Sequence, residues 1–325
     1  MPTLEELETA AGIVYRHIAP TPQINWPLLS ARCGCEVWVK HENHTPIGAF
    51  KIRGGLVYMD ATKKEHPEIA GVITATRGNH GQSVALAAKK AGLRAHVLVP
   101  QGNNPEKNAA MRAFGAEVEV YGDDFQESYE YAMAKAASLS LHPIPAFHPT
   151  LVLGVASYSL EFLKAVADLD TVYLPIGQGS GVCGMIAARD ALGLNTCIVG
   201  VVSQIADCYA LSFERKRAVS TETAATLADG IACRTPDPQA LKIILKGAER
   251  VVRVSEEAIV EAMGHYFTDT HNLAEGAAAA PLAALLGERD AMAGKRVGLV
   301  LTGGNADRNL YRRMLERMGN TNLHK

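Results

Sequence analysis

The chain contains no apolar run close to the roughly 20 residues that a helix needs to cross a bilayer, and it lacks a basic arm. Its 32 lysines and arginines almost balance 34 aspartates and glutamates, so the formal net charge is −2. This balance argues against nucleic acid and against an anionic membrane as partners. Residues 1–18 predict an acidic amphipathic helix, without the basic and apolar segments of a secretory signal. The sequence therefore predicts a soluble globular protein.

Cysteine is also scarce. The six cysteines are dispersed through apolar surroundings, at Cys33, Cys35, Cys183, Cys197, Cys208 and Cys233. In a chain of 325 residues this small number argues against a disulfide framework. The pair Cys33 and Cys35 has no second pair and no matching histidine spacing, so we do not expect it to bind a metal. We expect buried free thiols and a cytoplasmic location.

Strand-like apolar runs alternate with helical stretches from about residue 36 onward. The runs are EVWVK (36–40), GVITA (71–75), RAHVLVP (94–100), EVEVY (117–121), TVYLPI (171–176), CIVGVVS (197–203) and RVGLVL (296–301). Apolar strands that alternate with helices predict mostly parallel sheets covered by helices on both faces. The number of runs predicts an α/β protein with two doubly wound open sheets.

Two stretches mark the boundaries between the lobes that carry these sheets. LHPIPAFHPT at 141–150 is rich in proline and histidine and ends a long helical segment. HTPIGAF at 44–50 marks the entry into the other lobe. We predict a larger domain from residues 1–46 and 147–325, with a smaller domain from residues 47–146 inserted in it.

Lys51 is the first candidate for chemistry, and it lies in GAFKIRGG just before a predicted helix. A lysine amine forms a Schiff base with a cofactor aldehyde when burial or nearby positive charge lowers its pKa. The preceding Phe50 could lie against a planar ring. Considered alone, a solvated surface lysine is the commoner situation.

Three glycine-containing turns each follow a predicted strand. TATRGNHGQ at 74–82 leads into a helix, so its N–H groups could bind a carboxylate; a capped strand–helix turn is the alternative. GQGSG at 177–181 suits a single phosphate, and Val182 breaks the dinucleotide fingerprint. TGGN at 302–305 offers a hydroxyl to a ring nitrogen, or forms a tight turn. Because parallel strands place ligands at their carboxyl ends, the turns and Lys51 together predict one site.

These motifs resemble those of the fold-type II pyridoxal-phosphate enzymes, in particular the serine/threonine dehydratase and serine racemase group. FKIRGG is similar to the family's lysine motif, TRGNH to its S/T-x-G-N-H loop, GQGSG to its tetraglycine loop and TGGN to its S-G-G-N turn. ADGIACRTP at 228–236 resembles the A-D-G-I-A segment beside the cofactor. The resemblance covers almost the whole chain. It implies the tryptophan synthase β-like fold, pyridoxal 5'-phosphate as cofactor and a homodimer.

The same resemblance implies roles for residues at the matching positions. Lys51 would hold the cofactor and later act as the base on Cα, between Phe50 and Gly230, which would flank the ring. Asn79 would hydrogen-bond the cofactor's 3-oxygen, and Thr302 its ring nitrogen. The phosphate would be bound by Gly177, Gln178, Gly179, Ser180 and Gly181. The substrate carboxylate would be bound by Thr76, Arg77, Gly78, Asn79 and His80.

Two departures from the family pattern matter. Arg77 stands where racemase-like members have a serine that acts as the base on the opposite face, and an arginine stays protonated at neutral pH. Arg77 is therefore expected to contact the substrate or to point into solvent, and TRGNHGQS is similar to a branch associated with phenylserine and hydroxyectoine-pathway dehydratases. Some members bind a divalent ion through a glutamate and an aspartate. Here Asp207 keeps one ligand but Val201 replaces the other, so we expect no metal.

The resemblance implies a pyridoxal-phosphate-dependent dehydratase, or ammonia-lyase. It would convert an L-β-hydroxy amino acid of the threonine, serine or threo-3-phenylserine type to a 2-oxo acid and ammonia by α,β-elimination. A β-replacement synthase is an alternative, although such enzymes usually carry threonine at the position of His80. A racemase is disfavoured by Arg77, and a non-catalytic cofactor-binding protein is disfavoured by Lys51.

Overall fold

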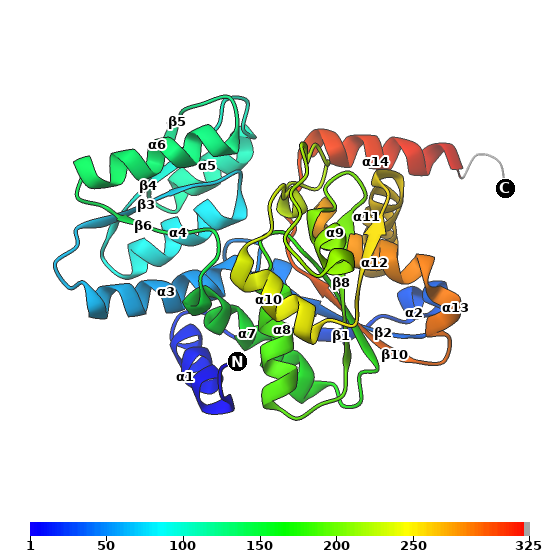
Figure 1. Cartoon of the computed structure of the whole chain (residues 1–325). Helices are drawn as coiled ribbons and strands as arrows, with labels where there is room; N and C mark the ends of the chain where they lie inside the picture. The colour runs from blue at the N-terminus through cyan, green and yellow to red at the C-terminus, as the bar shows by residue number, and fades with distance from the viewer. Residues whose placement is uncertain (322–325) are drawn as a thin grey trace.

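The computed structural model describes residues 1–321 and contains two lobes, each built around its own sheet (Figure 1). The larger sheet has six strands in the order β1-β2-β10-β7-β8-β9, and the smaller has four in the order β5-β4-β3-β6. The β1–β2 pair is antiparallel, and the other strand pairs of the two sheets are parallel. The predicted α/β architecture is therefore confirmed.

The strands and helices have the following bounds. The strands are β1 (Gln23–Asn25), β2 (Glu36–His41), β3 (Gly71–Ala75), β4 (Arg94–Val99), β5 (Ala116–Val120), β6 (His142–Pro143), β7 (Thr171–Pro175), β8 (Cys197–Ser203), β9 (Arg250–Val254) and β10 (Arg296–Leu301). The helices up to the middle of the chain are α1 (Leu4–Tyr15), α2 (Pro27–Cys33), η1 (Glu42–His44), α3 (Lys51–Glu65), α4 (Asn79–Lys90), α5 (Pro105–Ala113), α6 (Phe125–Ser138) and α7 (Pro149–Ala165). The later helices are α8 (Ser180–Ala191), α9 (Cys208–Arg215), η2 (Asp229–Ile231), α10 (Pro238–Gly247), α11 (Glu256–Thr270), α12 (Gly276–Gly287), α13 (Arg289–Met292) and α14 (Arg308–Thr321).

The smaller sheet is inserted in the larger one along the chain. Its strands β3 to β6 lie between β2 and β7, which both belong to the larger sheet. The chain enters the smaller lobe just before α3 and leaves it just before α7, and these two helices pack against each other. The insertion predicted from the sequence is confirmed, whereas the proposed boundaries at residues 46/47 and 146/147 stay a prediction.

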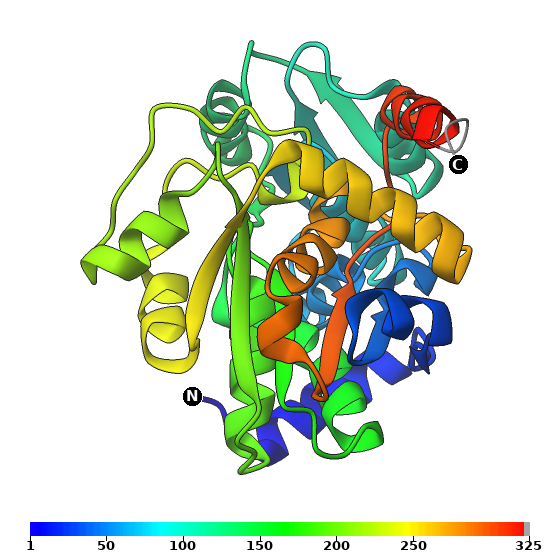
Figure 2. The same ribbon diagram turned by 90° about the vertical axis from the view of Figure 1, so that its right-hand side faces the viewer.

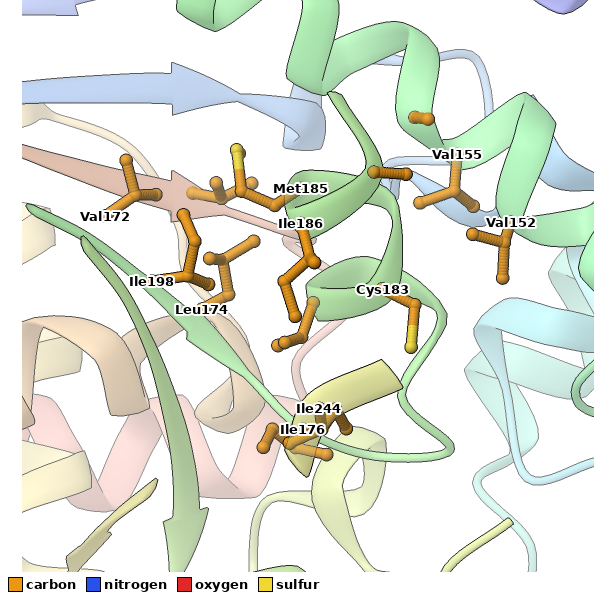
Figure 3. Packing of buried hydrophobic residues seen from close by; sticks show 14 of the residues in the cluster. Val152, Val155, Val172, Leu174, Ile176, Cys183, Met185, Ile186, Ile198 and Ile244 are labelled. Carbon is orange, nitrogen blue, oxygen red and sulfur yellow. The ribbon is translucent and has the colours of Figure 1, made fainter. Parts of the chain in front are cut away.

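Each face of the larger sheet is covered by helices, because alternate residues of a strand point to opposite faces. Val172 and Leu174 of β7 pack with α7, α8 and α10, as Figure 3 shows for the side chains around Ile186. Tyr173, between them, packs on the other side with α2, α11 and α12. Figure 2 shows α11 and α12 in front of the strands of this lobe. Both faces are therefore apolar, which explains the continuous apolar runs in the sequence.

Three strands, β1, β6 and β9, were not predicted from the sequence. β1 and β6 have three and two residues, too few to produce a recognisable pattern. β9 has the sequence RVVRV and lies at the edge of the larger sheet, where Arg250 pairs with Glu288 and Arg253 pairs with Asp207. Charged residues are common on edge strands, because they discourage pairing with another chain.

A buried ionic cluster lies where the chain enters the smaller lobe. Arg53 on α3 is fully buried and donates to Glu42 of η1 at 2.7 and 2.9 Å. It also donates to Glu161 of α7 at 2.6 and 3.0 Å, and Glu161 forms a second ion pair with the buried Lys40 of β2. The cluster connects β2, η1 and α7 to the first turn of α3. It thereby fixes the backbone two residues beyond Lys51.

The cysteines and the helix lengths bear on what the composition suggested. The six cysteines are free thiols, five of them buried and Cys197 partly exposed. Within residues 1–321, none of the helices combines the length and the apolar character that crossing a bilayer requires.

Candidate active site

The segment before Lys51 lies directly against the TGGN turn. The N–H of Phe50 donates to the carbonyl of Thr302 at 3.0 Å, and the N–H of Gly304 donates to the carbonyl of Gly48 at 2.9 Å. Ala49 and Gly303 form an isolated antiparallel bridge between these contacts. Segments from opposite ends of the sequence are therefore neighbours, and Lys51 begins α3 at the carboxyl end of β10.

Lys51 has the environment that a reactive amine needs. Its Nζ lies 3.3 Å from Oγ of Ser180 and 5.2 Å from the centre of the Phe50 ring. The hydroxyl of Ser83 donates to the Lys51 carbonyl at 2.7 Å, which holds the first turn of α3 against α4. Burial lowers the pKa of Lys51 to about 8, and the carboxylate of Glu275 opposes part of this effect. A substantial fraction of the amine is therefore neutral, and hence nucleophilic, near physiological pH.

Residues 177–181, the predicted phosphate loop, connect β7 to α8. Gly179 has φ +95° and precedes the first turn of α8, whose backbone N–H groups are available to an anion. A Cβ on Gly177 would lie 2.2 Å from the carbonyl oxygen of Gly230, and a Cβ on Gly179 would lie 2.8 Å from Cβ of Ala240. The loop therefore has space for glycine alone at two positions, and its last polar side chain, Ser180, contacts Lys51.

Residues 76–80, the predicted substrate loop, connect β3 to α4. Oγ1 of Thr76 accepts hydrogen bonds from the N–H groups of Gly78 at 3.0 Å and Gly81 at 3.2 Å, and so closes the turn. Arg77 at the tip is exposed and makes no hydrogen bond or ion pair with any other described residue. Thr76 therefore shapes the loop from within, whereas the side chain of Arg77 is free to move.

His80 provides a polar atom that the protein itself does not satisfy. Its Nε2 is buried and has no hydrogen-bond partner among residues 1–321. Burial, reinforced by the positive charge of Lys51, lowers the pKa of His80 to about 3, so the ring is neutral at physiological pH. Because buried polar atoms are almost always hydrogen-bonded, an unsatisfied one beside a reactive lysine is the signature of a ligand site.

Asn79 joins the substrate loop to the larger lobe. Its Nδ2 donates to both carboxylate oxygens of Glu275, at 2.8 and 3.1 Å, and its Oδ1 accepts from Nδ2 of Asn305 at 2.8 Å. Glu275 is 9 % exposed and precedes α12, with its backbone N–H bonded to the Gly303 carbonyl at 3.0 Å. Burial raises the pKa of the Glu275 carboxyl group. Sequence reasoning missed Glu275, although an acidic residue opening the apolar segment GAAAAPLAALLG was a usable signal.

The other predicted residues also lie in this region. Phe50 packs edge-on against the ring of Tyr158, with 5.9 Å between ring centres, and a Cβ on Gly181 would lie 3.9 Å from the Phe50 ring. Thr302 is 3 % exposed at the end of β10. Gly230 lies between the phosphate loop and α12, where an added Cβ would be 2.8 Å from Cβ of Ala277. The structure therefore brings Phe50, Gly230 and Thr302 to the same place as Lys51.

Helix α5 holds the smaller lobe against the larger one beside the site. Lys107 forms an ion pair with Asp229 at 2.8 Å, and its Cδ would lie 3.0 Å from a Cβ on Gly78. Asn104 donates to Asp307 at 2.6 Å in a second contact between the lobes. Lys107 therefore covers the substrate loop and reaches the segment that carries Gly230. Nothing in the sequence around Lys107 indicated this position.

The aspartate that resembles a metal ligand of some family members has a different partner here. The Asp207 carboxylate accepts a hydrogen bond from Nε of Arg253 at 2.7 Å, and the same guanidinium group pairs with Glu214. Val201, at the position of the second expected ligand, is fully buried. A guanidinium group thus satisfies the charge of Asp207.

Comparison with known proteins identifies the family. The model of the family described as "Pyridoxal-phosphate dependent enzyme" matches residues 14–303, so the chain belongs to that family. An L-threonine ammonia-lyase of Thermotoga maritima is 32 % identical over 98 % of this chain and 79 % of its own length. The crystal structure of a threonine deaminase from T.th. is 31 % identical, with a TM-score of 0.88 over 94 % of this chain and 99 % of that one. A pyridoxal 5'-phosphate-dependent aspartate racemase structure is 28 % identical, with a TM-score of 0.89 over 95 % and 98 % of the two chains.

The residues at the site fit the family's cofactor, pyridoxal 5'-phosphate. An aldehyde needs an amine with a lowered pKa, and Lys51 supplies one. A phosphate needs backbone N–H groups at a helix start without Cβ atoms in the way, and residues 177–181 meet that need next to Lys51. The family membership and this arrangement establish the cofactor of the protein.

Proposed function

We propose that this protein is an ammonia-lyase that converts an L-β-hydroxy amino acid to a 2-oxo acid and ammonia. The proposal is carried by Lys51, whose burial lowers the pKa of its amine to about 8. The amine contacts Ser180 of the phosphate loop, and its positive charge contributes to the lowered pKa of His80 in the substrate loop. It is supported by the L-threonine ammonia-lyase and threonine deaminase names of similar proteins. L-Threonine is therefore the first substrate to test, with L-serine and threo-3-phenylserine as the other candidates.

Pyridoxal phosphate, when bound, supplies an electron sink for the negative charge that develops at Cα of the amino acid. We propose that Lys51 holds the cofactor and that its amine then removes the proton from Cα. Phe50 and Gly230 would flank the cofactor ring, Asn79 would donate an N–H to its 3-oxygen, and the hydroxyl of Thr302 would face its ring nitrogen. The phosphate would be bound by Gly177, Gln178, Gly179, Ser180 and Gly181.

The substrate carboxylate would lie at the start of α4. Its proposed partners are Thr76, Arg77, Gly78, Asn79 and His80. The N–H groups of this turn, including the backbone N–H of His80, offer hydrogen-bond positions there. The neutral ring of His80 is hydrogen-bonded to the backbone of Ile144, so its unsatisfied Nε2 can accept a hydrogen bond from another part of the ligand. A carboxylate held at this turn would orient Cα toward Lys51.

The overall reaction balances without a further reactant. The Cα proton and the Cβ hydroxyl leave as water, which gives an enamine. Tautomerisation gives the corresponding imine, and one water molecule hydrolyses it to the 2-oxo acid and ammonia. No oxidant or reductant is consumed, so the side chains around the site need to provide acid–base chemistry alone.

A racemase is the second candidate, because an aspartate racemase is among the similar structures. Racemisation needs a second base on the face of Cα opposite Lys51. Racemase-like members carry the serine that acts as this base at the loop position that Arg77 occupies here. The guanidinium group of Arg77 stays protonated and cannot replace that base. We propose that Arg77 instead pairs with the substrate carboxylate or lies over its side chain. The exposed side chain has the freedom to do so.

Release of 2-oxo acid tests the proposed function. The holoenzyme is incubated with L-threonine, L-serine, threo-3-phenylserine and threo-3-hydroxyaspartate, and 2-oxo acid is measured as its hydrazone. We expect release from at least one of them, and its loss in Lys51→Ala. Lys64→Ala is the matched control, because Lys64 lies on the same helix with its side chain 72 % exposed. Holoenzyme that releases no 2-oxo acid from the four amino acids would reject the dehydratase.

The variant Arg77→Ala tests the proposed contact between Arg77 and the substrate of the dehydratase. We expect at least a tenfold loss of kcat/KM for 2-oxo acid release, with cofactor affinity unchanged, because the cofactor contacts do not involve Arg77. Conversion of an L-amino acid to its D-enantiomer faster than 2-oxo acid release would favour the racemase instead.

We also propose a homodimer, a cytoplasmic location and a smaller domain with boundaries at residues 47 and 146. Light scattering would test the homodimer, and fractionation of the source cells would test the cytoplasmic location. Expression of residues 47–146 alone would test whether the smaller domain folds within the proposed boundaries.

A further inference from the structure

The hydrogen bonds around Asn79 determine which way its side-chain amide faces. The carbonyl of Ile47 can accept hydrogen bonds but cannot donate them, so the Asn305 atom 2.8 Å from it must be the Nδ2 donor. The same Nδ2 donates to Oδ1 of Asn79 at 2.8 Å, which uses its second hydrogen. The amide nitrogen of Asn79 must therefore lie on the opposite side, toward Glu275. The Ile47 carbonyl thus fixes the positions of the oxygen and nitrogen in the side-chain amides of Asn305 and Asn79.

Glu275 then takes one of the two hydrogens on the Asn79 nitrogen. The distances from Nδ2 to the two carboxylate oxygens are 2.8 and 3.1 Å. Both oxygens of one carboxylate lie on the same side of the nitrogen, so they share a single hydrogen. One N–H of Asn79 remains for another acceptor.

The carboxylate of Glu275 occupies a space that two glycines leave open. A Cβ on Gly303 would lie 2.8 Å from Oε1, and a Cβ on Gly230 would lie 3.7 Å from the same atom. Its backbone N–H is bonded to Gly303, so α12 begins against the TGGN turn. The carboxylate is therefore held between the two segments proposed to contact the cofactor ring. Among the described residues, the charged groups Lys51, Lys107 and Asp229 and the titratable Tyr311 interact with this carboxylate.

We propose that Glu275 is the positioning residue that directs the remaining N–H of Asn79 toward the 3-oxygen of bound pyridoxal phosphate. The inference rests on the proposed cofactor contact of Asn79. Asn79 belongs to the smaller lobe, whereas Glu275 and Asn305 belong to the larger one. Together with Asn305, Glu275 thus sets a contact between the cofactor and a side chain of the smaller lobe. Its charge also acts on Lys51, since the carboxylate raises the pKa of the lysine amine.

Two substitutions distinguish the role of the Glu275 carboxylate as a hydrogen-bond acceptor for Asn79 from the role of its negative charge. Glu275→Leu removes both, whereas Glu275→Gln removes the charge and keeps an oxygen that can accept from Asn79. Glu257→Gln is the matched control, because Glu257 is exposed on α11. The cofactor dissociation constant is measured by titrating the apoprotein with pyridoxal phosphate and following the fluorescence change. The pH dependence of cofactor recombination reports the pKa of Lys51.

We expect Glu275→Leu to weaken cofactor binding by about 3- to 10-fold, the range of one lost hydrogen bond, and to shift the absorption band of the bound cofactor. Glu275→Gln should bind within about twofold of the wild type. It should, however, recombine with a lower apparent pKa, because the negative charge that raises the pKa of Lys51 is gone. The control should change neither quantity.

A double-mutant cycle with Asn79→Ala distinguishes positioning from a general structural role. If Glu275 acts through Asn79, Glu275→Leu should have little further effect in the Asn79→Ala protein. Additive losses would overturn the proposal, and so would native affinity and absorption in Glu275→Leu alone. If the leucine variant does not fold, the cycle is run with Glu275→Ala, which also removes the acceptor, using the absorption band as readout. Asn79→Ala with native affinity would overturn the cofactor contact of Asn79 and this inference together, while leaving the test of 2-oxo acid release unaffected.

Discussion

Replacing Arg53 with methionine should destabilise the protein far more than removing an exposed arginine. The guanidinium group is fully buried and makes five hydrogen bonds to Glu42, Glu161 and Ser157, besides one at 3.3 Å to Thr21. Methionine would fill much of the volume but none of the hydrogen-bonding positions. The substitution therefore tests the charge and its partners, with little contribution from a cavity.

The magnitude follows from which charges lose their partner. Glu161 would still pair with Lys40. Glu42, also fully buried, would keep a single side-chain hydrogen bond within residues 1–321, the one of 2.6 Å from the hydroxyl of Thr21. Leaving a buried charge without its partner costs about 3–5 kcal/mol. That corresponds to roughly two to four powers of ten in the unfolding equilibrium constant.

Urea unfolding followed by tryptophan fluorescence suits this measurement. The two tryptophans of the chain, Trp26 and Trp38, lie beside or within β2, close to the segment that carries Glu42. Arg16→Met is the matched control, because Arg16 pairs with Asp60 at 3.0 Å but its side chain is 58 % exposed. Exposed ion pairs contribute about 0–1 kcal/mol, so the control should stay within that range.

A further substitution identifies the cause of the loss. Combining Arg53→Met with Glu42→Gln should restore a large part of the lost free energy of unfolding, because no unpaired buried charge then remains at that position. The reasoning would be refuted if Arg53→Met lost no more stability than Arg16→Met. It would also be refuted if the added Glu42→Gln made the protein less stable still.

Two other predictions follow from the site. The rate at which the apoprotein recombines with pyridoxal phosphate should rise with pH through about 8, because the neutral amine of Lys51 is the reacting form and burial lowers its pKa to that value; a stopped-flow absorbance series would show it, and a rise beginning only above pH 10 would contradict it. Gly177→Ala should weaken cofactor binding at least tenfold in the same titration, since its Cβ would lie 2.2 Å from the carbonyl oxygen of Gly230. Gly287→Ala, with no atom near the added Cβ, should bind normally.

The parts of the fold that were predictable share a physical origin. A strand buried on both faces must be apolar along its length, so runs such as TVYLPI and RVGLVL were visible without a structure, and each matches a strand to within one residue at its ends. β9 was missed because an edge strand can carry arginines, and those arginines are satisfied by Glu288, Asp207 and Glu214 from other elements. Such partners cannot be read from a local pattern.

The candidate site divides in the same way. Lys51, Asn79 and Thr302 lie in short motifs whose glycines and strand ends indicate ligand binding locally, and the structure places all three together. Glu275 and Lys107 have no such motif, and their importance comes from residues more than 100 positions away. Arg77 is the opposite case, because its motif predicts a substrate contact while the side chain itself is exposed.

The sequence by itself determined the alternation of strands and helices, the glycine turns at strand ends and the family of the protein. These features depend on backbone conformation and on burial within a few residues, which neighbouring side chains specify. Only the tertiary structure decided the charge states and orientations at the site. The lowered pKa of Lys51, the neutral ring of His80 and the fixed amide of Asn79 depend on which distant groups surround each atom, and how much water they exclude, once the two lobes have packed together.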